Sequence, residues 1–217
     1  MMTLFLFGIL FSCTSTERYK KVELDKKSSY TSFFNAKERK PYSTFYTVKK
    51  EDIKGGVKRK NKFIEDTLCS AATNLDFVGS GYDRGHLKPA AVSKRNKHYM
   101  SESFYLSNIA PQFPYLNRVV WRSIESKTRN LLKTQDSLMI YTGVIYQKRA
   151  PLLNSNTEIP IYFYKAILLG DSSATIAYIA KNDSSSTNGG DYKTTINDIE
   201  KLIKFDLFSG LNEELEN

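Results

Sequence analysis

The chain has 217 residues, with 32 Lys and Arg against 23 Asp and Glu, which gives a formal net charge of +9. This length is in the single-domain range and is ample for one buried core. Two histidines and two cysteines without Cys-x-x-Cys spacing exclude a closed zinc site and a disulfide framework.

The first 13 residues predict an export signal. Residues 1–11 are apolar except for Thr3, a run shorter than the roughly 20 residues of a membrane anchor but long enough for the core of a signal peptide. Cys13 follows a small residue, with Leu10 three positions before it, which resembles the processing site of a bacterial lipoprotein. We expect an exported protein, attached to the cell envelope through lipid on Cys13 or, as the alternative, secreted. Lipidation would leave Cys69 as a lone thiol.

Basic charge is concentrated in two stretches. Residues 14–62 hold 15 basic and 6 acidic side chains, and residues 84–129 hold 9 and 2. The positive electrostatic field of such stretches attracts phosphate backbones and makes the binding of nucleic acid depend on salt. For residues 14–40, which show little apolar periodicity, we favour a polar basic tether, either solvated or drawn to anionic lipid. The folded domain is then expected over residues 41–217. No signature predicts sequence-specific readout of nucleic acid.

Residues 45–48 predict a strand and residues 49–62 a charged connection. Residues 81–90 predict strand, turn, strand, and carry Arg84 and His86. Histidine is the side chain best suited to take a proton near neutral pH. Arg84 alternates to the same face of an extended strand, where it can hold an anion beside His86. Taken alone, the tetrapeptide Asp-Arg-Gly-His at residues 83–86 favours a buried histidine in a turn-rich hairpin.

Residues 104–109 predict a short strand that Pro111 and Pro114 end, and residues 117–132 predict a helix. On that helix Asn117, Trp121, Glu125 and Arg129 follow at intervals of four, so they form one slowly drifting stripe. An amide oxygen, a carboxylate and a guanidinium on one stripe could bind a hydrated divalent cation and a phosphate together. Taken alone, the stripe favours a solvated helix face with a Glu-to-Arg pair.

The rest of the chain predicts further sheet and one more helix. Strands are expected over residues 138–146, 159–169 and 174–180, a loop over 183–191, and an amphipathic helix over 195–204 behind Thr194 or Thr195 as N-cap. The predicted fold class is α+β, a mainly antiparallel central sheet with flanking helices and with the His86 hairpin and the Asn117 helix on one side.

Together these segments resemble a known family. The residues that carry the resemblance run from Ser80 to Ala91, from Tyr105 to Ile109 with Pro111 and Gln112, and through Asn117, Trp121 and Glu125. In this order and spacing the chain resembles the DNA/RNA non-specific endonucleases of the ββα-metal class, the endonuclease G-like family. Weaker similarity extends through residues 140–143, 159–165 and 196–200, so the resemblance covers roughly residues 40 to 210.

The resemblance implies a role for each matching residue. His86 stands where the family has its general base, and Asn117 where it has the single protein ligand of the catalytic Mg²⁺, for which Mn²⁺ is an alternative ion. Glu125 matches the carboxylate that orients the water shell of the metal. Arg84 and Arg129 match arginines that contact the phosphate, and Asn108 matches a polar residue that supports the site. DNA and RNA are the implied substrates.

Two departures from the family pattern concern the geometry. Val119 stands two residues after Asn117, where the family often has glycine, which bears on how the helix begins. A further arginine that the family places before its hairpin has three counterparts here, Arg59, Lys60 and Lys62, and the sequence does not choose among them.

The same residues suit phosphodiester hydrolysis on chemical grounds alone. Phosphodiester hydrolysis needs an in-line nucleophile, charge stabilisation on the non-bridging oxygens and help for the leaving alkoxide. Mg²⁺ keeps several waters, so one amide ligand suffices. The alternatives are an inactive module of the same fold that grips nucleic acid or another polyanion, and an enzyme for a smaller phosphodiester. His98, the other histidine, is expected to be exposed.

Overall fold

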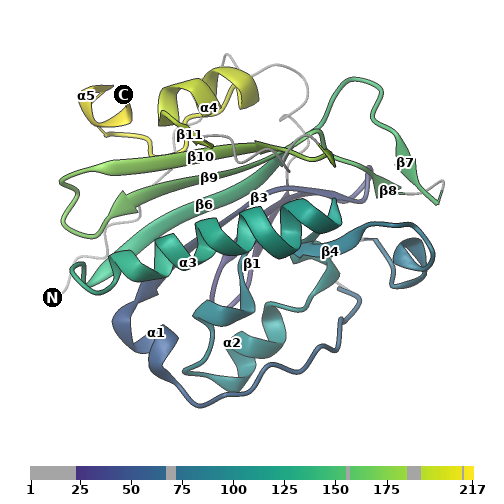
Figure 1. The fold of residues 1–217 in the computed structure, drawn as a ribbon, viewed down its shortest axis with the longest axis horizontal. Helices are drawn as coiled ribbons and strands as arrows, with labels where there is room; N and C mark the ends of the chain where they lie inside the picture. Colours follow the sequence, from purple (N-terminus) through teal and green to yellow (C-terminus); the bar gives the residue numbers. More distant parts are fainter. Residues whose placement is uncertain (1–22, 67–71, 155–156, 185–191, 212) are drawn as a thin grey trace, which may run out of the picture.

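The computed structural model describes residues 23–66, 72–154, 157–184, 192–211 and 213–217, and its centre is a seven-stranded antiparallel sheet (Figure 1). The sheet has the order β1-β2-β3-β6-β9-β10-β11. Its strands are β1 (Glu23–Lys26), β2 (Thr31–Asn35), β3 (Lys40–Lys49), β6 (Ser137–Ile145), β9 (Tyr162–Leu169), β10 (Thr175–Lys181) and β11 (Lys193–Thr194). The expected signal peptide, with Cys13, and also Cys69 and most of the loop at 183–191, lie outside the described residues.

Two small antiparallel pairs and five α-helices complete the described fold. The pairs are β4 (Asp83–His86) with β5 (Ile109–Gln112), and β7 (Leu152–Leu153) with β8 (Thr157–Glu158). The helices are α1 (Lys50–Lys54), α2 (Lys97–Glu102), α3 (Arg122–Leu131), α4 (Ile196–Ile203) and α5 (Glu213–Glu216). A π-helical turn, η4 (Leu116–Trp121), leads into α3, and 3₁₀ turns η1 (Leu75–Phe77), η2 (Ala90–Val92) and η3 (Leu106–Asn108) occur in the connections.

The alternation of side chains along β9 separates two cores. Phe163 and Ile167 belong to the cluster that also contains Ile124 of α3, while Tyr164 and Leu168 belong to the cluster beneath α4. Because successive side chains of a strand point to opposite faces, α3 and α4 cover opposite sides of the sheet, as Figure 1 shows.

Helix α4 starts where a capping side chain is available. The Thr195 hydroxyl accepts a hydrogen bond from the Asp198 N–H, so Thr195, one of the two expected residues, is the N-cap. The helix ends at Lys204, which has a left-handed conformation with φ of 56°. Its buried face consists of Ile196, Ile199 and Ile203, which is the amphipathic pattern the sequence predicts.

The predicted tether over residues 14–40 is wrong for residues 23–40, which form β1 and β2 of the sheet. Phe34 and Tyr30 are buried, and two of the lysines that suggested a solvated segment are paired: Lys27 with Asp66 at 2.9 Å and Lys40 with Glu158 at 2.8 Å. In the sequence, an edge of a sheet whose lysines pair with distant carboxylates therefore resembles a polar linker. Residues 14–22 lie outside the described part of the chain.

The predicted strand, turn, strand over residues 81–90 is also wrong in its second half. Only β4 is extended, and its partner is β5, about 25 residues further along, with His86 opposite Ile109 and Arg84 opposite Pro111. The segment after His86 turns into η2 instead. Residues 104–109 are likewise not one strand, since η3 occupies Leu106–Asn108 and the strand begins at Ile109.

Pro111 lies inside β5 and does not end it. A proline cannot donate a hydrogen bond to a ladder, but β5 has only one strand partner, and the Pro111 carbonyl accepts from the Asn182 side chain at 3.0 Å. The strands expected at 45–48, 138–146, 159–169 and 174–180 are all present, with shifted ends, and the predicted α+β class is confirmed. No helix among the described residues combines the length and the apolar character needed to span a membrane.

Candidate active site

Strand β4 places Arg84 and His86 on one face. The Phe63 ring lies 5.5 Å from the His86 ring and 5.2 Å from the Arg84 guanidinium carbon, so one aromatic side chain contacts both. Gly85, between them, is required by a close approach: a Cβ there would lie 2.5 Å from the Gln112 Oε1 of β5. The predicted alternation of Arg84 and His86 is therefore present, held by a tight β4–β5 pair.

One ring nitrogen of His86 is an acceptor with no partner in the described part of the chain. Burial and the charge of Arg59 lower the pKa of His86 to about 3, and a hydrogen bond to the backbone of Arg84 acts in the opposite direction. A backbone carbonyl accepts only from N–H, and Nε2 is buried with no partner among the described residues. The imidazole is therefore neutral, with its proton on Nδ1 and a lone pair on Nε2.

The Arg84 guanidinium is held by a hydrogen bond and by contacts with two aromatic rings. One Nη2 proton is donated to the Asn74 carbonyl at 2.9 Å, and the guanidinium carbon lies 5.0 Å from the Phe77 ring. Its Nε is buried without a partner within the described chain. The arginine is thus fixed in place while one donor stays available for an anion.

Asn108, predicted to support the site, is fully buried and acts through the backbone. Its side-chain oxygen accepts from the Lys88 N–H at 2.8 Å, and its NH₂ group donates to the Lys88 and Ser103 carbonyls, both at 2.9 Å. The Leu87 N–H also bonds the Asn108 carbonyl. Asn108 therefore fixes the two residues that follow His86, and it is a positioning residue.

Asn117 is oriented by a residue whose role the sequence did not reveal. Its NH₂ group donates to the Asp83 carboxylate of β4 at 2.9 Å, and the Arg118 guanidinium binds the same carboxylate at 2.6 and 2.8 Å. Burial acts to raise the pKa of Asp83, but the hydrogen bonds from Arg118 and Asn117, with the Arg118 charge, hold it below its usual value. No described residue donates to the Asn117 side-chain oxygen, which is left free for a ligand. Asp83 adjoins Arg84 in the motif, and that adjacency is the one signal that pointed to it.

The helix that carries Asn117 begins with a π turn. Residues 116–121 are π-helical, and Val119, where the family often has glycine, is exposed on this turn. Single π turns inside α-helices are frequent at functional sites. The extra residue per turn also moves Trp121 inward, where it is fully buried, so the predicted stripe is interrupted between Asn117 and Glu125.

Glu125 and Arg129 lie together on α3, as the spacing predicts. Their charged groups are 3.9 Å apart, and Arg129 also donates to the Ser126 hydroxyl at 2.8 Å. Burial raises the pKa of Glu125, and the charges of Lys165, Arg129 and Arg59 oppose that rise. Three cations thus surround one half-buried carboxylate.

Lys165 is the least expected member of this group. It is fully buried on β9, where its ammonium donates to the hydroxyls of Thr142 at 2.5 Å and Tyr46 at 3.2 Å and lies 5.5 Å from the Trp121 ring. Burial lowers its pKa to about 8, while the charge of Glu125 raises it. An isolated buried charge is costly, so Lys165 is a functional candidate. In the sequence, the one signal for Lys165 is the weak family similarity through residues 159–165.

Arg59 is the one of the three expected cations that the structure brings to the site. Its guanidinium carbon lies 5.4 Å from the Phe104 ring, which itself contacts the His86 ring at 5.1 Å. The charge of Arg59 influences the pKa values of both His86 and Glu125.

Unsatisfied polar atoms gather at this site. Buried side-chain atoms without a partner in the described chain include Arg84 Nε, His86 Nε2, both amide atoms of Gln112 and Trp121 Nε1. Buried polar groups are normally paired, so such a cluster indicates water or a polar ligand. Gln112, which lies opposite Asp83, is a further residue for which the sequence predicted no role.

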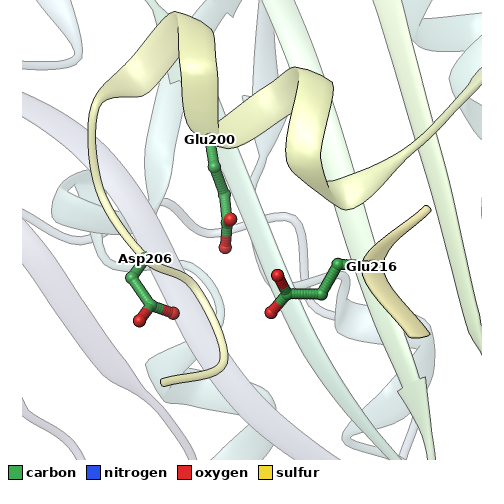
Figure 2. A group of neighbouring side chains, drawn as sticks. All are labelled: Glu200, Asp206 and Glu216. Carbon is green, nitrogen blue, oxygen red and sulfur yellow. The ribbon is translucent and has the colours of Figure 1, made fainter. Parts of the chain in front are cut away.

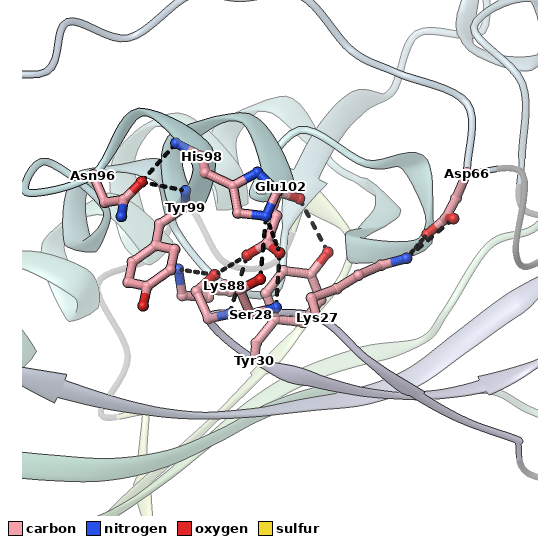
Figure 3. A network of polar contacts seen from close by, with 10 residues as sticks. Lys27, Ser28, Tyr30, Asp66, Lys88, Asn96, His98, Tyr99 and Glu102 are labelled. Carbon is pink, nitrogen blue, oxygen red and sulfur yellow. Dashed lines mark hydrogen bonds and ion pairs between the residues drawn. The ribbon is translucent and has the colours of Figure 1, made fainter.

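Two further groups of titratable side chains lie outside the candidate active site. His98 is exposed, as expected, and its Nε2 lies 3.2 Å from the Glu102 carboxylate; Figure 3 shows the network in which Glu102 also accepts from the Ser28 N–H. On the opposite side of the sheet Glu200, Asp206 and Glu216 converge (Figure 2). Burial and these two neighbours raise the pKa of Glu200 to about 7, opposed by the Leu207 N–H.

Comparisons with known proteins agree with this arrangement. The family model for the DNA/RNA non-specific endonucleases matches residues 14–214. Human mitochondrial endonuclease G is 31% identical over 162 residues, which are 68% of this chain and 54% of that protein, so the chain spans about half the length of this relative. Nuclease C1 of Cunninghamella echinulata var. echinulata is 30% identical over 209 residues, 86% of this chain and 83% of that protein.

A solved structure matches most of the fold. The crystal structure of an EndoG/EndoGI complex superposes with a TM-score of 0.79 at 25% identity, covering 88% of each chain. With the family model spanning nearly the whole sequence, the chain belongs to the DNA/RNA non-specific endonuclease family.

Proposed function

We propose that this protein is a metal-dependent endonuclease that hydrolyses phosphodiester bonds of DNA and RNA without sequence preference. Two observations carry the proposal: His86 is neutral, with an Nε2 that has no described partner, and Asn117, hydrogen-bonded to Asp83 of the same strand as His86, has an amide oxygen to which no described residue donates. Family membership and the net charge of +9 support a polyanionic substrate.

In the proposed mechanism His86 is the general base. A base must be unprotonated before it acts, and burial with Arg59 nearby keeps His86 neutral. A bound phosphate would offset the Arg59 charge and raise the pKa of His86 toward the range in which it can accept a proton from water. Asn108 keeps the segment after His86 fixed while the proton moves.

The residues around Asn117 fit Mg²⁺ or Mn²⁺. Hard cations prefer oxygen ligands, and Mg²⁺ retains several waters, so one carboxamide oxygen oriented by Asp83 meets the requirement. Bound at this oxygen, the ion would stabilise charge on the phosphate and on the leaving oxygen. Glu125, kept near three cations, would orient the water shell.

Arg84, Arg129 and Arg59 would hold the substrate. Each presents a guanidinium at the site, and Arg84 retains a buried donor without a described partner. Planar guanidinium groups bind phosphate oxygens well and keep their charge at all physiological pH values.

The test uses the full chain with Cys13→Ser to block lipidation. Supercoiled plasmid and total RNA are incubated separately, in Mg²⁺, in Mn²⁺ and in EDTA, beside an Asn117→Ala variant. We expect both polymers to be degraded only with metal, and the variant to need more metal and to react more slowly. Gel retardation without cleavage in any divalent metal would instead indicate the inactive binding module, and unchanged metal activation in Asn117→Ala would remove Asn117 as the ligand.

We also propose that residues 1–13 direct export and that Cys13 receives a lipid. The apolar run and the Leu10-to-Cys13 spacing support this. Membrane fractionation of a bacterial host that expresses the full chain provides the test: the protein should be found with membranes, and Cys13→Ser should release it. An unprocessed chain in the soluble fraction would contradict the proposal.

A further inference from the structure

A basic pocket adjoins the candidate active site at Arg129. Its cationic lining residues are Lys50, Lys54, Lys94, Arg129 and Lys133, and its volume is about 590 Å³. The pocket lies where α1, the segment after η2 and the C-terminal end of α3 meet; Figure 1 shows α1 on the side where α3 ends. Arg129 belongs to both sites, since it also lies 3.9 Å from Glu125.

All ionisable side chains that line this basic pocket are cationic. Lys50 is paired with Asp136 at 2.7 Å, and Arg129 lies 3.9 Å from Glu125. The remaining three, Lys54, Lys94 and Lys133, are exposed and have no carboxylate within 4.0 Å in the part of the chain that the structure describes. Uncompensated like charges repel one another, so their convergence favours an anionic ligand.

Backbone contacts fix the walls of the basic pocket. The Lys94 N–H donates to the Asp52 carbonyl at 3.0 Å, and the Lys94 carbonyl accepts from the Val57 N–H at 3.1 Å. Gly55 makes this approach possible, because a Cβ there would collide with the Lys94 carbonyl. The Lys50 N–H bonds the Asp136 carbonyl beyond α3. The three cationic segments are thus held in one arrangement before any ligand binds.

We propose that the basic pocket binds the backbone of the nucleotides that flank the scissile bond, so that the strand runs from the active site past Arg129 toward α1. This inference rests on the proposed nuclease function and deepens it, because it makes a polymer the preferred substrate over a small phosphodiester. Lys54, Lys94 and Lys133 would contact flanking phosphates. Ile53, Ala91 and Leu132 form an apolar floor on which a sugar or base can lie.

Helix-end electrostatics explains only part of this charge. Lys54 lies in the last turn of α1 and Lys133 just after α3, where cations are favourable near the helix dipole. Lys94 lies between η2, a turn of only three residues, and the N-terminus of the longer α2, where a cation is unfavourable. A ligand accounts for all three lysines, whereas helix ends account for two.

The test compares a triple variant, Lys54→Gln, Lys94→Gln and Lys133→Gln, with the unaltered full chain. The affinity for a fluorescein-labelled 20-nucleotide DNA is measured by anisotropy in EDTA, which prevents cleavage, over a range of salt concentrations. Each lost phosphate contact reduces the slope of log affinity against log salt by about 0.7 on single-stranded DNA and by about 0.9 on a duplex. We therefore expect the slope to fall by about 2–3 and the affinity at low salt to fall at least about tenfold. Hydrolysis of bis(4-nitrophenyl) phosphate in Mg²⁺, which has no flanking nucleotide, should stay within about twofold.

A matched control removes the same charge elsewhere. Lys148, Lys193 and Lys201 are also exposed and lie outside the basic pocket. If Lys148→Gln, Lys193→Gln and Lys201→Gln weaken binding equally, net charge alone acts and the proposal is overturned. An unchanged salt slope with a lowered melting temperature in the first variant would assign its lysines to helix ends and would also overturn it.

The two proposals fail in different ways. If the unaltered chain cleaves neither substrate, but binding still depends on Lys54, Lys94 and Lys133, the nuclease function fails and the basic pocket stands. If the chain degrades plasmid and the triple variant binds and cleaves like the unaltered protein, the pocket fails and the nuclease function stands.

Discussion

Replacing Lys165 with methionine should make the protein more stable and less active. Methionine has a similar length and can fill the space among Trp121, Tyr46 and Thr142. The two hydroxyls that now accept from the ammonium lie 3.2 Å apart and can bond each other, so neither loses its only partner. The substitution therefore removes a buried charge without leaving a buried polar group unsatisfied.

The magnitude follows from the pKa of Lys165, which burial lowers from 10.5 to about 8. Keeping the ammonium charged in the folded state at pH 7 costs about 3 kcal/mol relative to the unfolded chain. This cost is fully present below pH 8 and disappears as the pH rises to 10.5, because the unfolded chain binds more protons in that interval. After loss of the hydrogen bonds and the ring contact we expect a net gain of about 1–2 kcal/mol, or about 2–8 °C in melting temperature.

Activity should fall because Lys165 is the first of the cations that restrain the pKa of Glu125. Without it the pKa of Glu125 rises further, so the acid limb of the kcat/KM profile for plasmid cleavage should move to higher pH. Lys88→Met is the matched control. Lys88 is also buried, with its pKa lowered to about 8, but its charged neighbours are Glu102 and Asp52. In the Lys88→Met variant the acid limb of the kcat/KM profile should not move. A destabilised Lys165→Met protein, or an unmoved acid limb, would refute the reasoning.

Three further substitutions test the surrounding structure. Asp83→Asn should raise the Mg²⁺ concentration for half-maximal activity about tenfold or more, because the group that orients Asn117 loses its charge; unchanged metal titration would contradict this. Gly85→Ala should lower the free energy of unfolding in urea by about 1–3 kcal/mol, since its Cβ meets Gln112, and an unchanged midpoint would disprove that close approach. Glu200→Gln should raise the melting temperature at pH 8 but not at pH 4. The pKa of Glu200 is raised to about 7, so its ionisation opposes folding only above the unfolded value near 4.5, and equal shifts at both pH values would argue against this.

Elements with strong periodicity could be predicted from sequence. The alternation in β9 and the apolar face of α4 are local patterns, and both elements lie where expected. The partner of β4 could not be predicted, because pairing between strands about 25 residues apart depends on the whole core. The first two strands were missed for a related reason: Lys27 and Lys40 are neutralised by Asp66 and Glu158, which are distant in sequence.

The site was predictable where the family motif names a residue. His86, Asn117 and Glu125 lie on the expected elements, but their partners follow from three-dimensional packing. Choosing Arg59 over its neighbours required the Phe104 contact, and Lys165 required the fold of β9 against α3. A buried lysine in a strand otherwise resembles an exposed one in sequence.

Cleavage and binding by His86→Ala test the central claim most directly. The variant would be assayed for plasmid cleavage in Mg²⁺, and for affinity to the labelled 20-nucleotide DNA in EDTA, beside the unaltered chain. If His86 is the general base, cleavage should fall by about 10²–10⁴-fold while the affinity for DNA and the melting temperature stay nearly unchanged. Cleavage within about tenfold of the unaltered rate would contradict the role of His86 and the mechanism built on it.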